Sequence, residues 1–286
     1  MISVVIPVKD AGPDLQRCLD GIAAQRTGGE EVEVVVVDSG STDGSVAVAR
    51  AAGARVHEIP PAQFNHGATR NLGVSLARGD KLVFTSQDAH AERDDWLALL
   101  TAPLAEPRVA GAYGRQVAHE DASPSEQFFL DFLYGPRSRV QRAGARIGPQ
   151  DTLFSNVNAA IRRDVFARFP FVDDIVMSED QEWSARVLKE GYALHYVADA
   201  IVRHSHPYTL KQAFRRFYLS GLSARQSYLV ESSVGDLVRL HVAYPFRELA
   251  WLVRSGQSRW IPRAIAYQAV KGAGVVLGVL MSYRGS

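Results

Sequence analysis

The chain has 286 residues, of which 47% are hydrophobic and 22% charged, a composition typical of a globular protein with a full core. Its net charge is only +1, and no basic run is interleaved with aromatic residues, which argues against binding to nucleic acid. The single cysteine, Cys18, excludes an intrachain disulfide; a reducing compartment is compatible with it, and a small apolar filler on a helix is its simplest interpretation.

Strand-like and helix-like segments alternate through the first hundred residues. Continuous β-branched runs predict buried strands, and apolar residues at helical spacing predict the helices between them. In chain order the sequence predicts a strand over 2–8, a helix over 14–25, a strand over 32–37, a helix over 41–52, a strand over 54–58, a helix over 68–77, a strand over 81–85 and a helix over 94–105. This alternation indicates right-handed βαβ units and a parallel sheet.

The second half of the chain is less regular. It predicts strands over 109–117, 157–161 and 193–197, helices over 178–190 and 210–229, and helical structure after that. Residues 118 to about 149 are polar, contain several glycines and prolines, and are predicted to form a mobile insertion. The late glycines Gly272, Gly274 and Gly278 lie in an apolar helical run, so we interpret them as packing positions and not as a dinucleotide fingerprint.

Polar residues gather where three of the predicted strands end. These clusters are Lys9-Asp10, Asp38–Ser41 and Ser86–Asp88. Ligands of open α/β sheets bind at the carboxyl ends of the strands, so the clusters predict a binding site there. Asp38 could accept hydrogen bonds from a ribose or a base; the alternative is a turn before a helix capped by Ser41 or Asp43.

Acidic residues and histidines supply the candidate chemistry. Asp88 is placed to hold a hard divalent cation, although a single Asp at a strand end is also a common turn residue. Glu179 and Asp180 open a predicted helix, where acids also occur because they favour the helix dipole. His204 and His206 would present two imidazoles on one side of an extended segment, as metal ligands or as a buried, hydrogen-bonded pair.

The ordered set of motifs resembles the inverting family-two nucleotide-sugar glycosyltransferases of the GT-A fold over about residues 1–210. The motifs are SVVIPVKDAG, VVVVDSGSTDGS, HGATRNLGVSLARGDKLVFTSQDA, MSEDQEW and HSH. F-x-H-G-x-T-R-N together with Q-D-A and H-S-H more narrowly resembles bacterial rhamnosyltransferases that use dTDP-L-rhamnose.

This resemblance implies an α/β, Rossmann-like GT-A fold: a mixed, mostly parallel sheet flanked by helices, with a C-terminal helical extension. It divides the chain into a glycosyltransferase domain over 1–208 and a helical region over 209–286. Within the first, residues 1–90 would bind the nucleotide and residues 91–208 would carry the acceptor and catalytic half.

The resemblance also assigns roles to individual positions. Asp180 would be the catalytic base, with Glu179 beside it. Asp88 would bind Mg²⁺ or Mn²⁺; Ser86 replaces the first acid of the family's Asp-x-Asp motif, and His206 would compensate as a ligand. The residues implied for the nucleotide are Pro7, Val8, Asp10, Asp38, Ser39, Gly40, Arg70 and Gln87. The residues implied for the sugar or acceptor are His66, Asn71, Trp183 and His204.

The segment FNHGATRN, residues 64–71, carries more hydrogen-bonding groups than helix capping requires. In the glycosyltransferase interpretation it forms the wall of the donor site. Gly67 would allow a close backbone approach, Arg70 would supply positive charge near the diphosphate, and His66 and Asn71 would offer hydrogen bonds. For His66, a capping or packing role is the alternative.

The C-terminal region is basic and aromatic. Residues 231–286 contain 7 Lys and Arg against 3 Asp and Glu, a net charge of +4, with arginines at Arg239, Arg247 and Arg254. Residues 264–281 are apolar except for Gln268 and Lys271, and are slightly short for a membrane span. This pattern favours helices lying on an anionic membrane surface, at the cytoplasmic face of the plasma membrane; a helical bundle or a homodimer face is the alternative.

The predicted function is inverting transfer of a sugar, L-rhamnose from dTDP-L-rhamnose, to a hydroxyl of a saccharide or lipid-linked saccharide in cell-surface polysaccharide synthesis. A carboxylate base would take the acceptor's proton, with help from a divalent metal. Alternatives are the same fold with a UDP- or GDP-sugar, and a non-catalytic nucleotide-sugar-binding protein, motivated by Ser86. A nucleotidyltransferase would not use the Glu179-Asp180 base. A glycosidase needs two carboxylates flanking the sugar, and neighbours on one helix cannot face each other across it.

Overall fold

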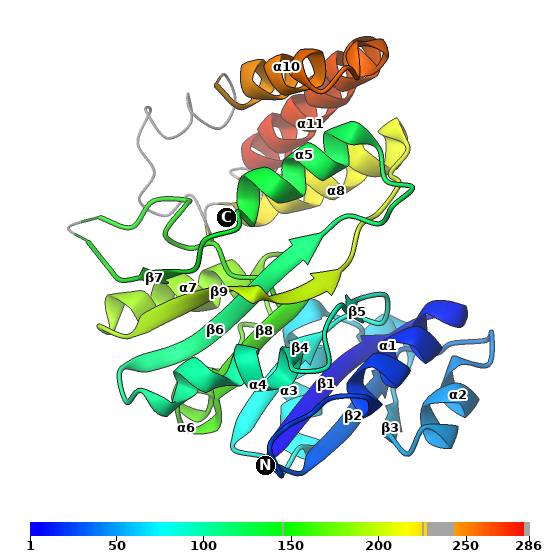
Figure 1. The fold of residues 1–286 in the computed structure, drawn as a ribbon, viewed down its shortest axis with the longest axis vertical. Helices are drawn as coiled ribbons and strands as arrows, with labels where there is room; N and C mark the ends of the chain where they lie inside the picture. The colour runs from blue at the N-terminus through cyan, green and yellow to red at the C-terminus, as the bar shows by residue number, and fades with distance from the viewer. Residues whose placement is uncertain (145, 225, 228–242, 283–286) are drawn as a thin grey trace.

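The computed structural model describes residues 1–144, 146–224, 226–227 and 243–282. Within them, nine strands form one sheet in the order β3-β2-β1-β4-β8-β6-β9-β5, and β7 also pairs with β9 (Figure 1). The strands are β1 Ile2–Val8, β2 Val32–Asp38, β3 Arg55–Glu58, β4 Lys81–Thr85, β5 His90–Ala91, β6 Val109–Val117, β7 Arg139–Gln141, β8 Asn158–Arg162 and β9 Ala193–Arg203.

The sheet is mixed, as predicted. Strands β3, β2, β1 and β4 are parallel, and so are β6 and β9. Strand β8 lies between these groups and runs antiparallel to both β4 and β6. The pairing is continuous from β4 to β8, across the predicted boundary at residue 90; the division of the chain at 90 and 208 stays a prediction.

Helices pack on both faces of the sheet and at one end of the molecule. The α-helices of the described residues are α1 Pro13–Ala23, α2 Ser45–Ala51, α3 His66–Leu76, α4 Trp96–Thr101, α5 Pro124–Leu133, α6 Arg163–Arg168, α7 Glu179–Lys189, α8 Leu210–Ser223, α10 Tyr244–Arg254 and α11 Ile261–Ser282. One core joins the sheet to α1 and α4 around the fully buried Trp96, and Cys18 is an apolar member of it, as expected. The opposite core joins the sheet to α3, α6 and α7 around Trp183.

The prediction of a mobile insertion over 118–149 is wrong for much of that segment, which contains α5 and β7. Ser123 caps α5 by accepting the amide of Glu126, and Phe128 is buried beneath it. The ring of Phe128 lies 5.5 Å from that of Tyr244 and 5.7 Å from that of Trp251, both in α10. The partners of Phe128 in α10 therefore come from more than a hundred residues away, where no local pattern reveals them.

Several element boundaries also differ from the prediction, and two of them bear on the candidate site. Helix α2 begins at Ser45 and not at residue 41, because the Ser41 hydroxyl bonds to Asp38 while Asp43 accepts the amide of Ser45. Strand β9 continues past the predicted end at 197 to Arg203, with a register shift against β6. The continuation matters because it carries the chain to the two histidines of the candidate site.

The C-terminal helices form the expected helical extension and lie with α5 at one end of the molecule (Figure 1). Helices α8 and α11 cross closely: a Cβ on Gly278 would lie 2.2 Å from the carbonyl oxygen of Tyr218, and one on Gly274 would lie 2.9 Å from that of Phe214. The packing interpretation is confirmed for these two glycines, whereas Gly272 has no such neighbour. Helix α8 ends at Ser223, earlier than the predicted end at 229; residues 225 and 228–229 of that prediction, and Arg239, lie outside the described residues.

Candidate active site

The polar clusters predicted at strand ends meet at one edge of the sheet. Strands β1, β2 and β4 end there at Val8, Asp38 and Thr85, and β9 ends at Arg203, directly before the histidine pair. Because β8 runs in the opposite direction, its first residue, Asn158, pairs with Thr85 at this same edge. Loops from both halves of the chain therefore converge on one place.

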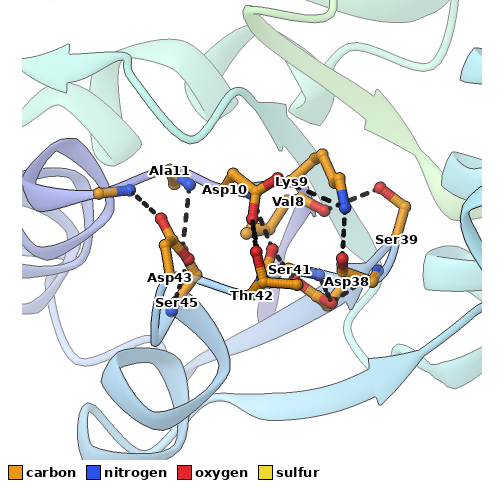
Figure 2. Close-up of polar contacts among 12 residues, drawn as sticks. Val8, Lys9, Asp10, Ala11, Asp38, Ser39, Ser41, Thr42, Asp43 and Ser45 are labelled. Atoms are coloured by element: carbon orange, nitrogen blue, oxygen red, sulfur yellow. Dashed lines mark hydrogen bonds and ion pairs between the residues drawn. The ribbon is translucent and has the colours of Figure 1, made fainter.

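The loops that follow β1 and β2 are joined by carboxylates (Figure 2). Asp38 accepts hydrogen bonds from the amides of Gly40 and Ser41, at 2.9 and 2.8 Å, and from the Ser41 hydroxyl at 2.5 Å. Asp10 accepts the amide of Thr42 at 2.8 Å, and this bond lowers the pKa of the Asp10 carboxyl. Asp38 is fully buried, so in this conformation it orders the loop and does not face solvent.

The other residues predicted for the nucleotide also shape these loops. Gln87 ties the loop after β4 to the loop after β1: its side chain accepts the amide of Lys9 at 2.7 Å and donates to the carbonyl of Lys9 at 3.1 Å. The Ser39 hydroxyl donates to the carbonyl of Val8 at 3.0 Å, and both residues are buried, whereas Pro7 is partly exposed. Contact of these residues with a nucleotide stays a prediction.

Several residues in the site loops have left-handed backbone conformations. Gly40 has φ +83°, and a Cβ there would lie 2.8 Å from Pro61. In the part of the chain that the structure describes, Asp10 and Ser178 are the non-glycine residues with positive φ, at 44° and 68°. Such strained conformations gather at functional sites. Asp10 lies in the predicted nucleotide loop, and Ser178 immediately precedes α7.

The segment 64–71 clamps another loop of the protein. Asn65 caps α3 by accepting the amides of Gly67 and Ala68, as helix N-caps do. A Cβ on Gly67 would lie 2.0 Å from the carbonyl oxygen of Val172. The close approach that we expected from a donor is therefore made by the backbone of residues that lead into α7.

Asn71 belongs to the same clamp. Its amide donates to the carbonyl of Phe171 at 2.8 Å and accepts the amide of Phe171 at 3.1 Å. Both polar atoms of the Asn71 side chain therefore have a backbone partner, and contact of Asn71 with the sugar stays a prediction. The segment thus positions the start of α7.

Arg70 is also directed toward α7. Its Nη1 lies 2.9 Å from Oε1 of Glu179, and both side chains are buried, at 8% and 6% exposure. Asn156 donates a second hydrogen bond to the same carboxylate at 3.0 Å. Burial opposes ionisation of Glu179, yet the charge of Arg70 and the Asn156 bond hold its pKa below the ordinary value. The expectation that Arg70 faces the diphosphate is wrong, and Glu179 serves as the counter-ion of Arg70.

Asp180 stands next to this ion pair and is partly exposed. Its carboxylate accepts the amide of Asn156 at 3.1 Å and that of Gln181 at 2.9 Å. Burial, together with the neighbouring negative charge of Glu179, raises the pKa of Asp180 to about 7. Among the described residues Asp180 has no cation of its own, since Arg70 is paired with Glu179. A carboxylate with a pKa near the working pH is well suited to general base catalysis.

His66 and Trp183, which the resemblance implied for the sugar or acceptor, have different environments in the structure. His66 begins α3 and is half-buried; burial, followed by the charge of Arg70, lowers its pKa to about 4, so the imidazole is neutral at pH 7. Contact of His66 with the sugar stays a prediction. Trp183 is 0% exposed, and its Nε1 donates to the carbonyl of Phe169 at 2.8 Å. The prediction that Trp183 faces sugar or acceptor is therefore wrong.

Asp88, His204 and His206 form a candidate metal centre. Their potential ligand atoms all lie within 4.8 Å of one another. Nε2 of His204 and Nδ1 of His206 each lie 3.6 Å from an oxygen of Asp88, too far for a hydrogen bond. The structure thus groups His204 with the candidate metal ligands, and not with the residues that the resemblance implied for the sugar or acceptor.

The donor set of this cluster fits a divalent transition metal. Burial lowers the pKa of His204 to about 3, so the imidazole is neutral and can act as a ligand. Ligands bound at about 2.1 Å lie roughly 3 Å apart around an ion, so these ligand atoms would move closer together when an ion binds. Two imidazoles disfavour Mg²⁺, which takes oxygen ligands, and leave Mn²⁺ as the better fit of the two expected ions.

Four further residues of the site escaped the sequence analysis: Asn156, which holds both acids of α7; Gln116, which lies 3.2 Å from Nδ1 of His204; Glu126, which accepts the amide of His206; and Arg216. Arg216 is exposed on α8, with its guanidinium 5.8 Å from the Tyr208 ring. That ring in turn lies 5.1 Å from His206. The only feature of the sequence that could have indicated Arg216 is the basic, aromatic run of α8. No sequence motif surrounds Asn156, Gln116 or Glu126.

Comparisons with known proteins agree with this geometry. The chain is 31% identical over 282 residues to the O-antigen chain rhamnosyltransferase RfbN of Salmonella typhimurium, covering 97% of this chain and 89% of the relative. It is 31% identical over 260 residues to the O-antigen chain rhamnosyltransferase WbaN of Salmonella anatum, covering 90% and 82%.

Among solved structures, the mannosyltransferase PcManGT from Pyrobaculum calidifontis in complex with GDP-Man and Mn²⁺ superposes with a TM-score of 0.67 at 19% identity, covering 99% of this chain and 86% of that one. TarS 1–349 of S. aureus in complex with UDP gives 0.55 at 14% identity, covering 100% and 92%. These likenesses confirm the predicted GT-A fold. Residues 3–169 match the family model described as "Glycosyl transferase family 2". The chain therefore belongs to glycosyltransferase family 2, and the protein is a glycosyltransferase.

Proposed function

We propose that the protein is an inverting, metal-assisted rhamnosyltransferase. It transfers L-rhamnose from dTDP-L-rhamnose to a hydroxyl of a saccharide or lipid-linked saccharide in cell-surface polysaccharide synthesis. The two Salmonella relatives support the sugar and the class of pathway. Both are named O-antigen chain rhamnosyltransferases, and both align with most of this chain. The observation that carries the chemistry is Asp180, a partly exposed carboxylate whose pKa is raised to about 7.

In this mechanism an acceptor hydroxyl attacks the anomeric carbon from the face opposite the diphosphate. The new C–O bond forms as the bond from the sugar to the diphosphate breaks, and Asp180 takes the hydroxyl proton. A positioned base contributes typically 10²–10⁴-fold to such a step. The amides of Asn156 and Gln181 hold the Asp180 carboxylate. Burial and the negative charge of Glu179 raise its pKa by more than these hydrogen bonds and the charge of Arg70 lower it.

The departing diphosphate gains negative charge, which requires cations. Asp88, His204 and His206 would hold a divalent ion that neutralises part of this charge when bound. Because Arg70 is occupied by Glu179, we assign the second cation to Arg216. Arg216 lies beside Tyr208, and its positive charge adds to the effect of burial in lowering the pKa of His66 and of His206.

Thermal denaturation in the presence of nucleotides tests the donor and the metal together. The protein is heated with dTDP, UDP or GDP, each with and without Mn²⁺ or Mg²⁺. A ligand at 100 times its Kd stabilises the native state by about 2.7 kcal/mol, enough for a visible shift in Tm. The proposal expects a dTDP-selective, Mn²⁺-dependent shift. A shift selective for UDP or GDP would contradict the rhamnosyl donor, and no shift with any nucleotide would contradict a nucleotide-sugar enzyme.

We further propose that the protein is cytoplasmic and contacts the inner face of the plasma membrane through α11. The outward face of α11 carries exposed apolar residues: Ile265, Ala269, Ala273, Val276, Leu277, Leu280 and Met281. The segment Ser258–Ser282 is also long and apolar enough to cross a membrane, by length and composition, with 22% of its apolar window buried. No Asp or Glu follows Glu248, while Arg254, Arg259 and Arg263 are exposed near the start of α11.

This charge pattern favours an anionic lipid surface over a second copy of the chain, since two copies would bring like charges together. Flotation with phosphatidylglycerol vesicles tests it. Replacing both Val276 and Leu280 with Asp should abolish flotation, whereas Gly272→Ala, in the same helix, should retain it. Equal flotation of all three proteins would contradict the proposal, and a wild-type dimer that the two Asp residues dissociate would support the alternative.

A further inference from the structure

Gln116 lies in β6 beside the candidate metal centre and is 4% exposed. Its Nε2 donates to the hydroxyl oxygens of Tyr134 and Ser155, both at 2.9 Å. A glutamine amide nitrogen has two hydrogens, so both are used. The remaining polar atom, Oε1, faces Nδ1 of His204 at 3.2 Å.

This arrangement decides which nitrogen of His204 carries the proton. With the Gln116 amide in this orientation, its oxygen can only accept a hydrogen bond, so Nδ1 donates to it. In a neutral imidazole the other nitrogen, Nε2, then has a free lone pair. Nε2 is the atom that lies 3.6 Å from Asp88 Oδ1, toward the centre of the cluster.

We propose that Gln116 is a positioning residue that fixes His204 in the Nδ1–H tautomer and thereby presents Nε2 as a metal ligand. The metal role rests on the proposed function; the tautomer is a property of the protein alone. Groups that hold the far nitrogen of a ligating histidine in this way commonly change metal affinity 10–100-fold when they are removed.

The same amide connects the two halves of the site. Gln116 holds Ser155, and the next residue, Asn156, donates its backbone amide to the Asp180 carboxylate and its side chain to Glu179. A single buried glutamine therefore braces the proposed metal ligand on one side and the loop that holds the proposed base on the other. Buried polar networks of this kind are stabilising when every member is paired, as both polar atoms of Gln116 are here.

The direct test is the tautomer of His204 in the metal-free protein. Long-range ¹H–¹⁵N correlation spectra of protein labelled with ¹⁵N-histidine distinguish Nδ1–H from Nε2–H imidazoles, and the His204 signals are those absent from His204→Gln. We expect Nδ1–H in the wild type, and a shift toward Nε2–H in Gln116→Leu. A wild-type His204 protonated on Nε2 would overturn the inference.

Mn²⁺ titration followed by electron paramagnetic resonance provides a second readout that needs no activity. Gln116→Leu should weaken Mn²⁺ binding about 10–100-fold, while Gln116→Glu, which keeps an acceptor facing Nδ1, should restore binding. Tyr134→Phe is the matched control, because it removes a partner of Nε2 but leaves Oε1 in place, and it should bind as the wild type does. Equal Mn²⁺ affinity of Gln116→Leu and wild type would overturn the inference. A wild type that binds no Mn²⁺ would instead refute the proposed metal role, with the tautomer still decided by the spectra.

Discussion

The Arg70–Glu179 ion pair should be among the most costly single contacts to break in this protein. The two charged atoms are 2.9 Å apart, and their side chains are 8% and 6% exposed. An exposed pair of this type contributes about 0–1 kcal/mol. Removing one partner of a buried pair leaves an uncompensated charge and costs about 3–5 kcal/mol. Arg70→Met should therefore lower the free energy of unfolding by about 3–5 kcal/mol, a large fraction of the 5–15 kcal/mol that is usual for a domain.

Urea denaturation followed by circular dichroism measures this loss, and a double-mutant cycle isolates the pair. Glu179→Leu alone should cost a similar amount, because it strands Arg70 in the same buried position. The double variant carries no buried charge, so it should be more stable than the sum of the two single effects predicts. A loss of less than 1 kcal/mol for Arg70→Met, or strictly additive effects, would refute the reasoning.

Three other predictions follow from the site. The kcat/KM of the wild type should fall below about pH 7, where Asp180 becomes protonated; a pH–rate profile that stays flat down to pH 5 would contradict this base. Arg216→Ala should raise the KM for the donor or lower kcat in steady-state kinetics, whereas Arg215→Ala, the neighbouring exposed arginine, should change neither; equal effects would contradict the assignment. Gly67→Ala should destabilise by about 1–3 kcal/mol in thermal unfolding through overpacking, whereas Gly272→Ala, which has open space, should be neutral or stabilising; the reverse order would contradict the clamp.

The sequence predicted the location of the site well because parallel strands impose it. Polar residues after buried β-branched runs had to meet at one edge of the sheet, and Asp88 and the two histidines do meet there. The direction of the strands explains why this prediction was correct. Because β1, β2, β4 and β9 run in the same direction, their carboxyl ends lie at the same edge of the sheet.

Side-chain pairing could not be predicted in the same way. Nothing within 100 residues of Arg70 indicates that its partner is Glu179, and an arginine in a glycosyltransferase motif is naturally assigned to the phosphate. Trp183 follows the two acids, yet its position on α7 turns it into the core. Gln116 carries no signal of its own, because its role depends on hydrogen bonds to three residues brought in by three other segments.

The central claim is that Asp180 is the base of a metal-dependent sugar transfer, and one comparison tests it most directly. Release of dTDP from dTDP-L-rhamnose is measured for wild type and Asp180→Asn, with Mn²⁺ and a bacterial extract of lipid-linked saccharides as acceptor, while donor binding is measured by calorimetry. The account predicts turnover lowered by at least about 10²-fold, with donor affinity close to the wild-type value. Turnover by Asp180→Asn within a few-fold of wild type would contradict it.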